Sequence, residues 1–166
     1  MLILNLGCGH PGEDMPDSNF VNLDRNPKYG DRTGWTVEDR LERWPDGSVN
    51  AVTISHLLMY VSLHTWHMLF DEIARVLKPC GVVRITEDVI LDPASRHWGG
   101  HDPLHSSWKG RVVTGMSPLL VIDMLELSGI LAVQVDATES HFTGADIRQD
   151  RHGGPPHVFY VEGMKE

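Results

Sequence analysis

The segment Leu4-Asn5-Leu6-Gly7-Cys8-Gly9 decides how this chain is interpreted, because it joins a short apolar run to a glycine turn. Residues 2–6 are predicted to form a buried strand, and residues 7–12 spell G-x-G-x-x-G directly after it. Asp24 ends the next predicted strand, Phe20-Val21-Asn22-Leu23. Such glycines let a backbone approach a nucleotide, and the acid accepts two ribose hydroxyls. The pattern predicts a nucleoside-type ligand, with an ordinary tight turn as the alternative.

The residues behind the glycines separate two classes of such ligands. Pro11-Gly12-Glu13-Asp14-Met15-Pro16 supplies two carboxylates, and Pro16 breaks any helix there. A dinucleotide pyrophosphate requires a helix N-terminus directly after the glycines and would be repelled by these acids. S-adenosylmethionine carries a sulfonium and an ammonium but no phosphate. The segment therefore favours S-adenosylmethionine over a nicotinamide dinucleotide.

The rest of the chain alternates predicted strands and helices. The further strands expected are Trp35–Val37, Ala51–Ile54, Gly81–Thr86, Ile130–Val135 and His157–Glu162. One helix is predicted over residues 64–77, and a second begins at Ser117 or Pro118 and is closed by Gly129. This alternation predicts an α/β fold with a mostly parallel sheet. Residues 88–116 show little regular pattern and are expected to be a long irregular loop on the acceptor side.

Bulk properties narrow the class of protein. The length of 166 residues predicts a single domain spanning 1–166. The formal net charge of -9 disfavours nucleic acid as a partner, since duplex binding needs a positive surface. The two cysteines, Cys8 and Cys80, are expected to be reduced, which predicts a cytoplasmic protein. No run approaches the ~20 apolar residues of a membrane span, and the opening residues 1–4 carry no basic leader.

Several segments, in this order, resemble the class I S-adenosylmethionine-dependent methyltransferases, in particular small predicted methyltransferases of the type 11-like group. The first two are residues 4–9 and the strand that ends at Asp24. The later ones are Pro45-Asp46-Gly47-Ser48-Val49-Asn50-Ala51-Val52, Ser55-His56-Leu57-Leu58, Arg75-Val76-Leu77-Lys78-Pro79-Cys80-Gly81, Asp102-Pro103-Leu104-His105 and the helix at 119–129. Together they cover most of the chain.

The resemblance implies a fold and a set of cofactor contacts. The fold is a Rossmann-like seven-stranded sheet of order 3-2-1-4-5-7-6, with strand seven antiparallel and helices on both faces in a three-layer sandwich. The cofactor implied is S-adenosyl-L-methionine. Its methionine part would lie against the backbone of Asn5, Gly7, Cys8 and Gly9, its ribose against Asp24 and Arg25, its adenine against Asp39 and Arg40, and Ser55 and His56 would line the methionine side.

Three positions depart from the family pattern. Asn5 stands where an acid is common, so its contact to the ligand ammonium must be weaker or indirect. Cys80 replaces a glycine, which is expected to affect only the turn. Met59-Tyr60 occupies positions that resemble the Glu-His pair of many relatives, so any acceptor chemistry done by that pair differs here.

Candidates for acceptor chemistry come from histidines and one tyrosine. His105 is the first candidate for a general base or acceptor contact, because histidine titrates near neutrality. Tyr60 is the second, with ordinary packing as its alternative. The four-residue spacing of His97, His101 and His105 also suits metal ligands on a helix. Glycines at 99–100 and a proline at 103 argue against a helix there, so no metal site is expected.

Three alternative functions are consistent with these features. The first is a methyltransferase whose acceptor, not readable from the residues, is a small molecule or a glycan. The alternative is a non-catalytic cofactor-binding domain of the same fold, motivated by Asn5 and Met59-Tyr60. The third is a nucleotide-dependent oxidoreductase or metal hydrolase. Since no helix precedes the first predicted strand, the site is expected to be open or closed by a partner subunit, for example in a homodimer.

Overall fold

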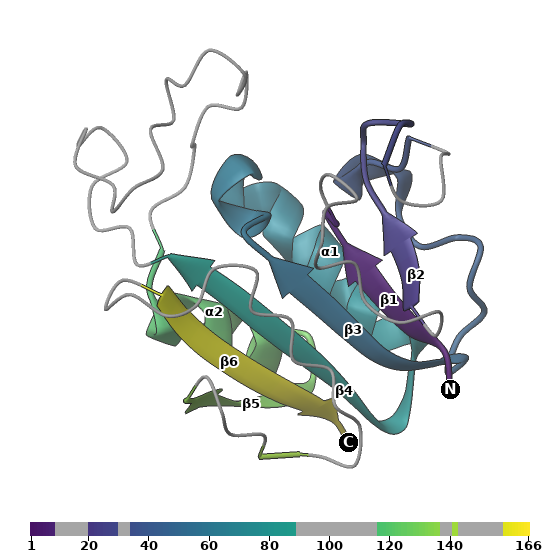
Figure 1. The fold of residues 1–166 in the computed structure, drawn as a ribbon. Helices are drawn as coiled ribbons and strands as arrows, with labels where there is room; N and C mark the ends of the chain where they lie inside the picture. The colour runs from purple at the N-terminus through teal and green to yellow at the C-terminus, as the bar shows by residue number, and fades with distance from the viewer. Residues whose placement is uncertain (9–19, 30–33, 89–115, 137–140, 143–157) are drawn as a thin grey trace, which may run out of the picture.

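The computed structural model describes residues 1–8, 20–29, 34–88, 116–136, 141–142 and 158–166, which form one sheet with helices packed on it (Figure 1). The strands are β1 (Ile3–Leu6), β2 (Phe20–Leu23), β3 (Val49–Ser55), β4 (Leu77–Asp88), β5 (Ile130–Val135) and β6 (Val158–Lys165). The helices are α1 (Leu63–Val76), α2 (Pro118–Leu127) and two short 3₁₀ helices, η1 (Val37–Asp39) and η2 (Leu58–Tyr60). Among them, none is long and apolar enough to cross a bilayer.

The strand order is β2-β1-β3-β4-β6-β5. The first four strands are parallel, and β6 runs antiparallel to both β4 and β5. This confirms the α/β class and the mostly parallel sheet with a reversed last strand. The order is also the one implied by the family resemblance, without its third strand.

The predicted strand at Trp35–Val37 is wrong. Thr36 and Asp39 form a capping box, in which the Thr36 backbone N–H donates to Asp39 Oδ2 at 2.7 Å and starts η1. The buried Trp35 indole donates to the Arg40 carbonyl at 2.8 Å and closes the same turn. These local bonds compete with a ladder, so β2 ends the described sheet on that side.

Both α-helices lie on the same face of the sheet (Figure 1). The apolar stripe of α1 packs with alternate strand residues of that face in one cluster, which also takes in Val121 and Leu125 of α2. The stripe consists of Trp66, Leu69, Phe70, Ile73 and Val76. The described residues therefore form two of the three expected layers.

The helix ends follow the signals in the sequence. The Ser62 side chain accepts from the Thr65 N–H at the start of α1, and Ser117 accepts from the Leu120 N–H at the start of α2. Gly129 adopts a φ of 78° just after α2, as a helix-closing glycine does. The predicted helices at 64–77 and from Ser117 or Pro118 are thus confirmed within a residue or two.

Arg75 joins two segments that the family resemblance had identified separately. Its guanidinium donates to the Leu41 and Trp44 carbonyls at 3.2 and 3.1 Å, and contacts the carboxylates of Asp46 and Glu72 at 2.7 and 2.9 Å. The hydrogen bond from Arg75 lowers the pKa of Glu72, and both carboxylates raise the pKa of Arg75. Arg75 therefore ties the chain before β3 to the end of α1.

Cys80 lies in a strained turn within β4. Val49 pairs with Leu77 and Ala51 with Val82, so residues 78–81 bulge out of the ladder. Cys80 takes a φ of 59° in this bulge, a conformation that favours glycine. A Cβ on Gly81 would lie 2.8 Å from the Lys78 carbonyl oxygen, so the second glycine of the family motif is sterically required here.

We predict that Cys80→Gly stabilises the protein by about 1 kcal/mol, because glycine removes the cost of the left-handed conformation. The free energy of unfolding in urea measures this. Cys80→Ala is the matched control, since it removes the thiol but keeps the Cβ. An equal gain from Cys80→Ala would show that the thiol, and not the backbone, carries the cost.

Candidate functional site

The glycine turn after β1 is joined to the end of β2. The N–H groups of Gly7 and Cys8 both donate to the Leu23 carbonyl, at 2.8 and 3.0 Å. Gly7 has a φ of 70°, and a Cβ there would lie 3.0 Å from the Leu57 side chain. Cys8 is buried. The turn thus requires glycine for both conformation and space, as the sequence pattern predicts.

Asp24 follows Leu23 directly and begins a turn of its own. Its Oδ1 accepts the Asn26 N–H at 2.8 Å, and the side chain is half-buried. Arg25 is exposed, and its carbonyl lies 3.4 Å from where a Cβ on Gly34 would be. The predicted ribose residues therefore lie beside the glycine turn on one side and close to Gly34 on the other.

Asn5 has a structural use that explains its departure from the family. Its Nδ2 donates to Asn22 Oδ1 at 2.7 Å, and its Oδ1 accepts from Thr53 Oγ1 at 3.2 Å. The buried amide thus links β1 to β2 and β3. An ionised carboxylate can only accept, so an acid could not donate to Asn22 as this amide does.

The end of β3 brings Ser55 and His56 to the same edge of the sheet as Gly7. The Ser55 side chain is buried, and its Oγ has no hydrogen-bond partner within the described ranges. His56 takes a φ of 51°, and its N–H donates to the Thr86 carbonyl at 2.9 Å. The structure thus brings both predicted residues to the carboxyl end of β3, level with the glycine turn.

Glu87 is a site residue that sequence reasoning missed. It is fully buried at the end of β4, and its Oε1 accepts the N–H groups of Leu57 and Leu58 at 2.8 and 2.7 Å. The Trp66 indole donates to the Leu58 carbonyl at 3.0 Å from the other side. These contacts hold η2 and the half-buried Tyr60 after β3. The available signal was an acid at the carboxyl end of a predicted buried strand.

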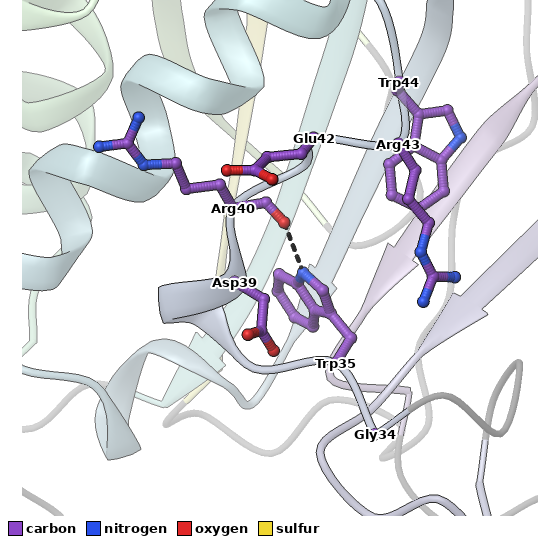
Figure 2. Close-up of a pocket in the computed structure, with 7 residues that line it drawn as sticks. All are labelled: Gly34, Trp35, Asp39, Arg40, Glu42, Arg43 and Trp44. Carbon is purple, nitrogen blue, oxygen red and sulfur yellow. Dashed lines mark hydrogen bonds between the residues drawn. The ribbon is translucent and has the colours of Figure 1, made fainter.

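A pocket of about 320 Å³ lies where the third strand was expected (Figure 2). It is lined by Gly34, Trp35, Asp39, Arg40, Glu42, Arg43 and Trp44. The predicted adenine residues, Asp39 and Arg40, thus share one pocket with two indole rings. Asp39 Oδ2 is engaged by Thr36, and the Arg40 carbonyl by Trp35, so both are held in place. Aromatic faces beside a carboxylate suit a planar base with an amino group.

Other predicted site residues lie outside the part of the chain that the structure describes. They are Gly9, His97, His101, His105 and the long acceptor-side loop between Asp88 and Met116. The roles of His105 as base and of Tyr60 as acceptor contact stay predictions. Of the cofactor residues, Gly7, Cys8, Asp24, Ser55 and His56 gather at the carboxyl edge of neighbouring parallel strands.

Comparison with solved structures finds the same architecture over nearly the whole chain. An S-adenosylmethionine-dependent methyltransferase from Mesorhizobium loti is 18% identical with a TM-score of 0.57, covering 99% of this chain and 90% of that one. The chain has the class I methyltransferase fold. Residues 16–85 also match the family model of the methyltransferase domain, which confirms the resemblance seen in the sequence. No curated protein matches the chain.

Two further structures show the same class I fold. A methyltransferase from Archaeoglobus fulgidus is 14% identical, with a TM-score of 0.56 and coverage of 98% of this chain and 85% of that one. The DhpI structure in complex with SAH is 16% identical, with a TM-score of 0.58 and coverage of 97% and 74%. At these identities the likeness concerns the arrangement of strands and helices.

We predict that Glu87→Ala destabilises the protein by about 2–4 kcal/mol, because the buried N–H of Leu58 and the part-buried N–H of Leu57 lose their acceptor. Glu87→Gln keeps an oxygen at this position and should cost only about 1 kcal/mol. Urea unfolding measures both, and the exposed Glu38→Ala serves as the control. A Glu87→Ala protein as stable as the control would mean that the turn after β3 is held by other contacts.

Proposed function

We propose that this chain is an S-adenosylmethionine-dependent methyltransferase acting on a small molecule or a glycan. The observation that carries the proposal is the meeting of Gly7, Asp24 and Ser55 at one edge of a class I methyltransferase fold. Gly7 has a positive φ, Asp24 is an acid directly after β2, and Ser55 is a buried residue at the end of β3, where the resemblance places the methionine side of the cofactor.

The described residues suit the cofactor that the family uses. The acid after β2 can accept ribose hydroxyls, and Asp39 can accept an adenine amino group in the pocket that it shares with Trp35 and Trp44. S-adenosylmethionine, when bound, supplies an activated methyl group on a sulfonium. The protein then needs mainly to hold donor and acceptor in line, which can contribute several kcal/mol, up to about 7–11 kcal/mol, of barrier reduction.

Catalytic residues are proposed from two regions. Tyr60 is the last residue of η2, whose position is set by Glu87 and Trp66, so its side chain is carried on a well-anchored turn. His105 is proposed as a general base, because imidazole is the side chain whose unperturbed pKa lies near neutrality. The cytoplasm is the proposed location, since both cysteines, buried Cys8 and exposed Cys80, are free thiols.

We predict that S-adenosylhomocysteine binds the purified protein and that Asp24→Asn raises its dissociation constant at least tenfold, or about 1.4 kcal/mol. The charged carboxylate is the better acceptor for two ribose hydroxyls. Isothermal calorimetry measures both affinities. Asp123→Asn, an exposed acid on α2, should leave the affinity unchanged. No binding to the wild-type protein at millimolar ligand contradicts the proposed function.

Turnover separates an enzyme from a non-catalytic cofactor-binding domain. The protein is incubated with S-adenosylmethionine and a panel of acceptors, and S-adenosylhomocysteine is quantified by mass spectrometry. Methyl transfer above the rate without acceptor is expected for at least one acceptor class. Tight cofactor binding without transfer to any class would favour the non-catalytic alternative.

A further inference from the structure

The face of the sheet opposite the two α-helices carries side chains in rows that the strand register aligns. The row at the start of the parallel strands is apolar and consists of Phe20, Ile3, Ala51, Val82 and Met164. The next row is polar and consists of Asn22, Asn5, Thr53, Arg84 and Glu162. Beyond it, Ser55, Thr86 and Tyr160 form a row of three hydroxyls on β3, β4 and β6. This face thus changes from apolar side chains at the start of the strands to polar side chains toward the carboxyl edge.

The hydroxyl row lies beside the glycine turn. Ile54 pairs with Leu6, so Ser55 lies level with Gly7, and Thr86 and Tyr160 continue the row away from it. All three side chains are at least 93% buried. Burying a hydroxyl without a partner is costly, yet Ser55 Oγ has none among the residues that the structure describes. A bound molecule that reached this row would supply the missing hydrogen bond.

The row next to these hydroxyls contains two charged side chains, Arg84 and Glu162, which pair with each other. Arg84 Nη1 contacts Glu162 Oε1 at 2.8 Å, and both side chains are 1% exposed. The Arg84 guanidinium also lies 5.3 Å from the centre of the Tyr160 ring. Glu162 Oε2 accepts the His141 N–H at 2.7 Å, so the carboxylate is engaged at both oxygens. A charged ligand would have to compete with this ion pair. The hydroxyl groups of an uncharged ligand can instead donate hydrogen bonds to the Ser55, Thr86 and Tyr160 hydroxyls and accept hydrogen bonds from them.

We infer that Ser55, Thr86 and Tyr160 form the acceptor subsite and that it takes an uncharged, hydroxyl-bearing molecule, either a sugar or a phenol. The inference rests on the proposed function, because the position of the row has meaning only if a methyl donor lies on the glycine turn. Transfer to such an acceptor forms an oxygen–carbon bond and breaks the sulfur–carbon bond. The sulfonium becomes a thioether, and the hydroxyl proton leaves to solvent.

Matched acceptors test the charge preference. Wild-type protein with saturating S-adenosylmethionine is given methyl glucoside against methyl glucuronide and methyl glucosaminide, and phenol against 4-hydroxybenzoate and tyramine. Production of S-adenosylhomocysteine is measured. The neutral member of at least one set is expected to have a kcat/KM at least tenfold above that of its charged counterparts. Preference for a charged member, or no transfer to either neutral compound, overturns the inference.

Isosteric variants test the residues. Thr86→Val and Tyr160→Phe remove one hydroxyl each, and each should raise the KM of the neutral acceptor at least fivefold while kcat changes less than threefold. The dissociation constant of S-adenosylhomocysteine should stay within twofold, which a general loss of structure would not allow. Ser128→Ala removes a hydroxyl that bonds Asp71, away from the row, and should change nothing. An unchanged KM in both variants overturns the subsite.

The two proposals fail in different ways. If wild-type protein does not bind S-adenosylhomocysteine, the proposed function is wrong. If it binds and transfers methyl groups only to charged acceptors, or to none of the neutral ones, the methyl-donor site stands and the neutral subsite is wrong.

Discussion

The parallel register of β2, β1, β3 and β4 is the constraint on which the other features depend. Because these strands run in the same direction, their carboxyl ends meet at one edge, which brings together residues far apart in the sequence. Two N–H groups of the glycine turn share the Leu23 carbonyl, and the N–H of His56 bonds the Thr86 carbonyl. Backbone bonds between neighbouring strand ends thus set the positions of Asp24 and Ser55, and a slip in register would separate them.

Buried and half-buried polar groups hold the two ends of β3 in place. Glu87 fixes the turn after β3 by accepting two N–H groups, and Arg75 fixes the opposite end of β3 through the chain before it. Such contacts add little net stability compared with apolar packing, but breaking one leaves an unsatisfied buried group. The apolar core on the helix face supplies the stability, and the polar contacts select one geometry for the turns around the site.

The two faces of the sheet differ in the polarity of their side chains. The helix face is apolar along the strands and joins the main core, whereas the opposite face changes from apolar to polar toward the carboxyl edge. Burying a row that contains Arg84 and Glu162 is costly unless the two are paired, as they are here. The pairing leaves the hydroxyls of Ser55, Thr86 and Tyr160 as the uncharged polar groups at the carboxyl end of that face. This distribution of charged and uncharged polar side chains is the basis on which we infer a neutral acceptor.

Patterns within a few residues were readable from the sequence: both α-helices, the start of the second at Ser117 or Pro118, every strand of the described sheet, the glycine turn, and Asp24 after β2. They are local consequences of apolar periodicity, capping and the conformational freedom of glycine. The third strand was predicted wrongly, because the Thr36 N–H bonds the Asp39 carboxylate and the Trp35 indole bonds the Arg40 carbonyl, and these bonds turn the chain away from a strand. Glu87, Arg75 and the Arg84–Glu162 pair act on partners 29 to 78 residues away. Their roles follow from strand register and chain reversal, so only the tertiary structure decided them.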